Sequence, residues 1–210
     1  ARSTMGMGDQ IEASMDAVYE ELMQNSEQQA IKDLLAIFVV FTQLKRVADQ
    51  AKNLCEETVF AVTGEQKAEK VFNILFVDED NSLLSQMAVA IARNSYPKSG
   101  RYSSAGRTPA ANLHPSLVQF LEQRGIDTWG TRLMGLNLTH AELSAKHLIV
   151  SLQGAVRSYF PEIPFHTSAL EWNLGTPSAT PSESEMEDIY RQLASRISDL
   201  MELLRGENAN

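Results

Sequence analysis

The chain has 210 residues, 43% hydrophobic and 21% charged, which suits a folded protein with one full domain and a smaller element. Its formal net charge of −9 disfavours nucleic acid and anionic membranes as partners, because both would bind against net repulsion. The single cysteine, Cys55, excludes an intrachain disulfide and a cysteine-based zinc cluster, and no apolar run reaches the roughly 18 residues that span a bilayer, so we expect a cytoplasmic protein.

The first segment, residues 1–66, predicts a helical hairpin. Residues 9–63 contain no proline, and their only break is Asn25-Ser26-Glu27. The second helix, about 27–62, carries a wide apolar face made of Ile31, Leu34, Leu35, Phe38, Phe41, Leu44, Val47, Ala48, Ala51, Leu54, Cys55 and Val59, and Gly64 suits its C-cap. Two helices cannot enclose this face, so a second copy, the following segment or missing upstream helices must cover it. We expect a homodimer through the hairpin. Because the chain starts with Ala1 and not Met, we also expect a processed N-terminus or missing upstream residues.

The second segment, residues 67–210, alternates short apolar strands with amphipathic helices, which predicts an α/β domain with a parallel sheet. The expected strands are 72–77, 101–104, 147–152 and 168–172. The expected helices are about 83–95, 115–124 and 183–205, and Ser182 with Glu185 suits the N-terminus of the last one.

Three acids, Asp78, Glu79 and Asp80, directly follow the first apolar strand. A receiver domain begins in this way, but it needs a further Asp at the end of its third strand, and residues 147–153 contain none. A haloacid-dehalogenase-type phosphotransferase needs a second acidic pair and a positioned Lys, and neither is evident. The third alternative is a phosphate-binding loop with replaced chemical residues. Mg²⁺ held by the three carboxylates stays an alternative to a solvated acidic turn.

Several markers in order resemble the low-molecular-weight protein tyrosine phosphatase and arsenate reductase family. The family loop, Cys-x-Gly-Asn-x-Cys-Arg-Ser, aligns with Asp78-Glu79-Asp80-Asn81-Ser82-Leu83-Leu84-Ser85. Ser104-Ala105-Gly106 follows the second strand, as in the family, and Arg124-Gly125-Ile126-Asp127 matches a helix exit. The resemblance covers about residues 71–204. It implies a three-layer α/β sandwich with a four-stranded parallel sheet.

The family's catalytic residues are replaced in this register. Asp78 stands at the nucleophilic Cys, Leu84 at the phosphate-clamping Arg, and Thr176 at the general-acid Asp. We therefore expect a protein with no catalysis of the family's kind and no cofactor or metal. The alternative is an active phosphatase or phosphotransferase that uses Asp78 with a metal ion.

Four residues correspond to the family's anion-binding loop: Asp78, Asn81, Ser82 and Ser85. Backbone amides of such a loop converge on an anion. We expect the Asp78 carboxylate to turn inward as a resident anion and to accept hydrogen bonds from these amides and from the Ser85 hydroxyl.

The helix around Leu44-Lys45-Arg46-Val47-Ala48-Asp49-Gln50-Ala51-Lys52-Asn53 resembles the repeat of the PhoU family of phosphate-uptake regulators. Lys45 stands where that family has a metal-associated acid, so no metal is expected there. The resemblance implies a regulatory helix face at Lys45, Arg46 and Asp49, as opposed to a merely solvated one. It also implies a protein partner among phosphate-transport or signalling components.

Overall fold

The computed structural model describes residues 31–64, 71–127, 132–164 and 166–205. The chain divides into two compact units, 1–69 and 70–210. The first helix of the expected hairpin lies outside the described residues. Within the described ranges, no helix is both long enough and apolar enough to cross a membrane.

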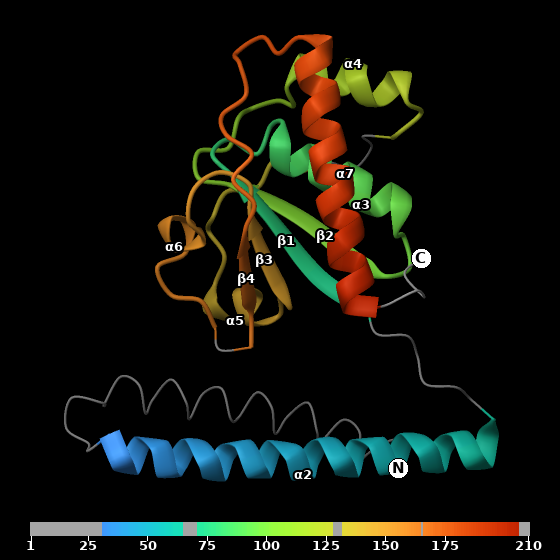
Figure 1. Ribbon diagram of the computed structural model, residues 1–210, viewed down its shortest axis with the longest axis vertical. Helices are drawn as coiled ribbons and strands as arrows, with labels where there is room; N and C mark the ends of the chain where they lie inside the picture. The colour runs from blue at the N-terminus through green and yellow to red at the C-terminus, as the bar shows by residue number, and fades with distance from the viewer. Residues whose placement is uncertain (1–30, 65–70, 128–131, 165, 206–210) are drawn as a thin grey trace. The chain divides into compact units, whose positions relative to one another are not determined.

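The described part of the first unit is one continuous helix, α2 (Ile31–Thr63), of 33 residues (Figure 1). It ends where the sequence predicts, at Gly64, whose φ of 69° lies in the left-handed region that glycine adopts without strain. The Gly64 amide donates to the Phe60 carbonyl oxygen at 2.8 Å, which satisfies an acceptor at the helix end.

The second unit is built on a four-stranded, all-parallel sheet, as predicted, with strand order β2-β1-β3-β4. The strands are β1 (Phe72–Asp78), β2 (Gly100–Gly106), β3 (Leu148–Ser151) and β4 (Ser168–Glu171). The central strand, β1, is almost wholly buried because both faces of the sheet are covered. The four expected strands are all present, and their bounds shift by at most two residues at either end.

Helices cover both faces of the sheet and make three layers (Figure 1). The face with α3 (Leu84–Ser95), α4 (Pro115–Gln123) and α7 (Glu183–Arg205) encloses the larger core, which includes Ile74 and Phe76 of β1. The opposite face packs Leu75 and Val77 against the short helices α5 (His140–Ser144) and α6 (Val156–Tyr159). The predicted α/β sandwich is therefore confirmed. The two short helices were not predicted.

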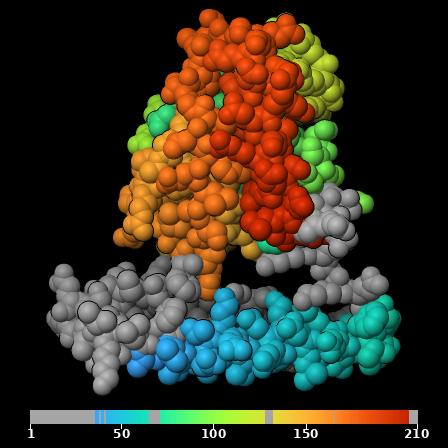
Figure 2. Space-filling model, viewed as in Figure 1, coloured from blue at the N-terminus to red at the C-terminus, as the bar shows by residue number. Residues whose placement is uncertain are grey.

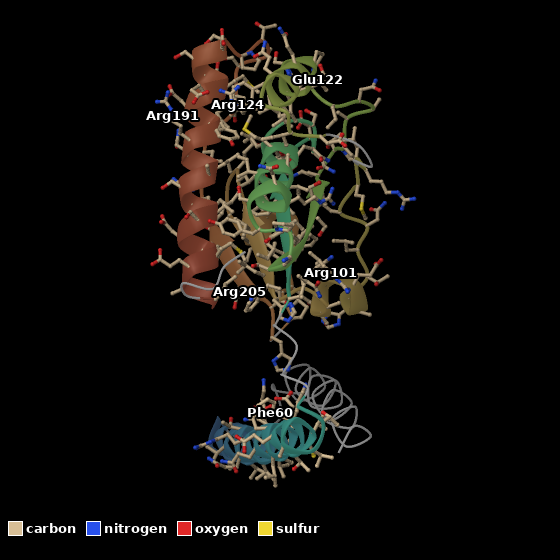
Figure 3. All side chains as sticks on the ribbon, turned by 90° about the vertical axis from the view of Figure 1, so that its right-hand side faces the viewer. Phe60, Arg101, Glu122, Arg124, Arg191 and Arg205 are labelled. Carbon is tan, nitrogen blue, oxygen red and sulfur yellow. The ribbon has the colours of Figure 1, made fainter. Side chains whose placement is uncertain are left out.

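Helix α7 lies on the surface of this unit along its whole length (Figure 2). Its start follows the expected capping pattern, because the Glu185 amide donates to the Ser182 hydroxyl oxygen at 3.2 Å. Arg124, labelled in Figure 3, directly follows α4 and pairs with Glu187 of α7, which joins the two helices. Its guanidinium also stacks over the Phe120 ring of α4.

Candidate functional site

The candidate site is the loop that joins β1 to α3 at the carboxyl end of the sheet. Parallel α/β folds place their ligands at this edge, outside the ends of the strands. Asp78 is the last residue of β1, and α3 begins at Leu84. Only five residues separate the two elements, so the backbone of the loop must turn tightly over the end of the strand.

The Asp78 carboxylate points into this loop and is only 1% exposed. One oxygen, Oδ1, accepts the Asn81 amide at 2.7 Å, and Oδ2 accepts the Ser85 amide at 2.8 Å. Burial raises the pKa of Asp78 to about 6, and the hydrogen bonds from Ser85 and Asn81 partly oppose this shift. The side chain is therefore mainly ionised at neutral pH and occupies the loop as an anion. The prediction that it turns inward and accepts loop amides is confirmed.

Asn81 organises the interior of the loop. Its φ of 52° lies in the left-handed region, which asparagine tolerates better than most residues. Its side-chain oxygen accepts hydrogen bonds from the Ser85 hydroxyl and from the side-chain nitrogen Nε2 of Gln86, both at 2.9 Å. Its side-chain nitrogen donates to the Met134 carbonyl oxygen at 3.1 Å. The Ser85 hydroxyl, which was predicted to donate to Asp78, donates to Asn81 in the structure. It is still close enough to Asp78 to lower the pKa of that carboxyl group.

Ser82 donates to the carboxylate of Asp80 and not to that of Asp78. Its amide donates to Asp80 Oδ1 at 3.0 Å, and its hydroxyl donates to Asp80 Oδ2 at 2.7 Å. The loop thus holds two carboxylates, each of which accepts two donors. Ser82 belongs to the loop, as the resemblance implies, but it contacts Asp80 and not the anion at its centre.

Glu79 is held by a network on the outer side of the loop that the sequence analysis missed. Its carboxylate pairs with Arg107 at 3.2 Å and accepts the Tyr159 hydroxyl at 3.0 Å, and its backbone amide donates to the Gln153 side chain at 3.0 Å. Arg107 also lies 4.8 Å above the Tyr159 ring. Burial raises the pKa of the Tyr159 hydroxyl most, and the hydrogen bond to the Glu79 carboxylate raises it further, so the hydroxyl keeps its proton and remains a donor. In the sequence, the one indication that Arg107 lies near the loop is its position directly after Ser104-Ala105-Gly106.

Gly106, the last residue of that motif, lets β2 approach the loop closely. A Cβ atom at this position would lie 2.6 Å from the Asn81 amide nitrogen, which is too close for any side chain. The Gly106 amide donates to the same Met134 carbonyl that accepts from Asn81. The motif is therefore tied to the loop by contact as well as by sequence order.

The two other positions aligned with catalytic residues carry no suitable group. Leu84, which the sequence resemblance aligns with the phosphate-clamping Arg, is 1% exposed and packs in the larger core. Thr176 is exposed in the segment between β4 and α7, where it lines a hollow with Glu185 and Asp188 of α7. Neither side chain can clamp a phosphoryl group or protonate a leaving group.

The three acids do not converge on a common point. Asp78 binds the loop amides, Asp80 binds Ser82, and Glu79 binds Arg107 and Tyr159. Among the residues that the structure describes, no group of three or more His, Cys, Asp or Glu is arranged to hold a metal ion. The geometry does not fit the alternative in which the three carboxylates hold Mg²⁺.

The other residues singled out in the sequence do not belong to this loop. Arg46 and Asp49 are exposed on α2, Lys45 is half-buried there, and all three belong to the other unit. Cys55 is half-buried on the same helix. In the second unit, Trp172 packs against Phe76, with ring centroids 5.8 Å apart, and so has a structural role in the larger core.

No protein-family model matches the chain, and no curated protein sequence matches it. Solved structures do match. A thioredoxin-dependent arsenate reductase from Corynebacterium glutamicum has 21% identity and a TM-score of 0.53, with 78% of this chain and 76% of that one covered. The tyrosine phosphatase Wzb from Escherichia coli K30, in complex with sulphate, has 18% identity and a TM-score of 0.53, with coverage of 64% and 99%. An arsenate reductase from Archaeoglobus fulgidus has 21% identity and a TM-score of 0.50, with coverage of 60% and 97%.

These similarities define the fold of the second unit. It is the fold shared by low-molecular-weight tyrosine phosphatases and arsenate reductases, which confirms that part of the resemblance found in the sequence. Identities of this size establish the fold and not the activity.

Proposed function

We propose that the chain is a non-catalytic regulatory or interaction protein whose phosphatase-like loop is occupied by its own Asp78 carboxylate. One observation carries the proposal: both carboxylate oxygens of a 1%-exposed Asp78 accept backbone amides of the loop. Solved proteins of this fold are described in complex with sulphate and in a phosphate-binding state. Here a side chain of the protein supplies the negative charge that such a ligand would bring.

The identities of the aligned residues support the same proposal. Removing one member of a catalytic unit can cost roughly 10⁴- to 10⁶-fold in rate, and the nucleophile lies at the upper end of this range. In this chain the nucleophile, the clamping Arg and the general acid are replaced together by Asp78, Leu84 and Thr176. A buried, doubly hydrogen-bonded carboxylate is also a poor nucleophile, because each oxygen already accepts an amide and, at 1% exposure, the side chain is closed to a substrate.

The first unit supplies the proposed link to phosphate regulation. Its resemblance to the PhoU repeat suggests a protein partner among phosphate-transport or signalling components. Lys45, Arg46 and Asp49 are the candidate contacts for this partner. Of these, Arg46 and Asp49 have exposed side chains.

An activity assay separates this proposal from the alternative of an active enzyme. The full chain is incubated with an aryl phosphate, and separately with arsenate and a thiol reductant, with and without Mg²⁺. We expect no turnover above the buffer rate in any condition. Turnover that requires Mg²⁺ and disappears in Asp78→Asn would support the alternative, in which Asp78 acts with a metal ion. A pull-down from native extract tests the link to phosphate transport. Recovery of phosphate-transport or signalling components by the wild type and not by Asp49→Ala, which lies outside the proposed dimer interface, would support the link, and recovery of none would contradict it.

A further inference from the structure

Helix α2 carries an exposed apolar face that is separate from its half-buried face. Six large side chains, which we call the outer stripe, are 53–81% exposed: Val39, Val40, Leu44, Val47, Leu54 and Val62. At about 100° per residue, all six fall within an arc of about 140° on the helix surface. The half-buried residues Ala48, Cys55 and Val59 lie on the adjoining face. Exposed apolar surface of this extent usually marks an interaction site.

Four of the six side chains of the outer stripe are placed almost symmetrically about Ala51. Val40 and Val62 stand eleven residues before and after it, and Val47 and Leu54 lie on either side close to the middle. Ala51 itself is exposed within the same arc, and its small side chain allows another helix to approach closely. Such a surface is complementary to itself when a second copy is turned end to end, as a two-fold axis requires.

The charges that border the stripe distinguish the two possible orientations. Arg46 and Glu57 are both exposed and lie along the same edge of the stripe. Their midpoint falls between residues 51 and 52, close to the centre of the stripe. An antiparallel pair of helices brings this edge of each copy together and sets each Arg46 beside Glu57 of the other copy. A parallel pair instead places this edge against the opposite edge, which carries Ala48 and Cys55.

From the exposed stripe, its symmetry and this charge pattern, we propose that α2 is the dimer interface of the protein, with two copies packed antiparallel about Ala51. The inference deepens the expectation of a homodimer by naming its helix, orientation and centre. It does not depend on the state of the Asp78 loop, which lies in the other unit.

Cysteine cross-linking of the full chain tests the orientation directly. In a Cys55→Ser background, Ala51→Cys is expected to form a disulfide dimer under mild oxidation, because the two copies of this residue meet at the axis. Val40→Cys alone is expected not to cross-link, since its two copies would lie about 33 Å apart. A mixture of Val40→Cys and Val62→Cys chains is expected to cross-link. Efficient self-cross-linking of Val40→Cys would show a parallel pair and overturn the proposal.

Sedimentation velocity tests the interface itself. The full chain is expected to be dimeric at micromolar concentration, and Val47→Glu/Leu54→Glu is expected to be monomeric. The matched control is Phe60→Glu, an equally drastic change at a residue that is exposed on α2 but lies outside the stripe (Figure 3). A monomeric parent chain, or equal dissociation of Phe60→Glu, would contradict the proposal.

A charge exchange covers the case in which the double Glu variant fails to fold. Arg46→Glu and Glu57→Arg are each expected to weaken dimerisation by roughly 2- to 30-fold, since each removes two exposed ion pairs per dimer. The double exchange Arg46→Glu/Glu57→Arg is expected to restore it. Equal weakening in the double exchange would overturn the antiparallel arrangement.

Discussion

Asp78 and Ser85 stand at opposite ends of one tight loop, and the Ser85 amide donates to the Asp78 carboxylate at 2.8 Å. The hydrogen bond spans the connection between β1 and α3, so the charge at the end of the strand is satisfied by the first turn of the helix. Its partner, the Asn81 amide at 2.7 Å, completes a two-donor cradle. The Asp78 carboxylate therefore fills the space between these two amides.

The first prediction concerns the stability of the cradle. Asp78→Ala removes the acceptor and leaves two buried amides without a partner, each of which costs about 1 to 3 kcal/mol. Urea unfolding is expected to show a loss of about 2 to 5 kcal/mol in the free energy of unfolding. Asp80→Ala is the matched control, because it also removes the acceptor of two donors, the Ser82 amide and hydroxyl. Asp80 is exposed, so water can take the place of its carboxylate, and the loss is expected to be less than about 1 kcal/mol. Equal losses in the two variants would argue against the cradle.

The second prediction concerns pH. The pKa of Asp78 is raised from 3.8 to about 6 in the folded protein, chiefly by burial. A raised carboxyl pKa means that its contribution to stability is fully present below about pH 4 and is lost as the pH rises through about 6. Relative to Asp78→Asn, the wild type is expected to lose on the order of 3 kcal/mol across this window. A difference that grows in favour of the wild type between pH 4 and 6 would mean that the pKa is depressed.

The third prediction concerns the close approach of β2 to the loop. Gly106→Ala places a Cβ atom 2.6 Å from the Asn81 amide nitrogen, so the loop must shift. Overpacking of this kind costs about 1 to 3 kcal/mol. Gly135→Ala is the control, because its Cβ atom would meet only Pro109 at 3.6 Å, an ordinary contact. If thermal unfolding showed the same small change for both variants, the loop would not be held against β2.

The fourth prediction concerns the independence of the two units. Residues 67–210 contain both cores of the α/β sandwich. Expressed alone, they are expected to be soluble, folded and monomeric, because the proposed dimer interface is on α2. Light scattering with circular dichroism checks this. A dimer of the shortened chain would place the interface in the α/β unit.

The sheet and long helices could be predicted from the sequence because their signals are local. The apolar run before Asp78 and the amphipathic stripe of α7 determine which face each element buries. The short helices α5 and α6 could not be predicted, since five and four residues give no periodicity to detect.

The inward turn of Asp78 could be predicted because a loop of converging amides needs an anion, and only this residue stands at its base. The pairing of Ser82 with Asp80 could not be predicted, because the sequence does not show whether a donor of the loop reaches the carboxylate of Asp78 or that of Asp80. The network of Glu79 with Arg107 and Tyr159 joins residues up to 80 positions apart, and only the fold brings them together.

Isothermal titration calorimetry with inorganic phosphate and with vanadate tests the central claim most directly. If the Asp78 carboxylate is the resident anion of the loop, the wild-type chain is expected to show no binding below about millimolar concentration, because a second anion would meet both a filled cradle and a like charge. Asp78→Ala is expected to bind either oxyanion more tightly than the wild type, and Asp80→Ala is not. Micromolar binding by the wild-type chain would contradict the account.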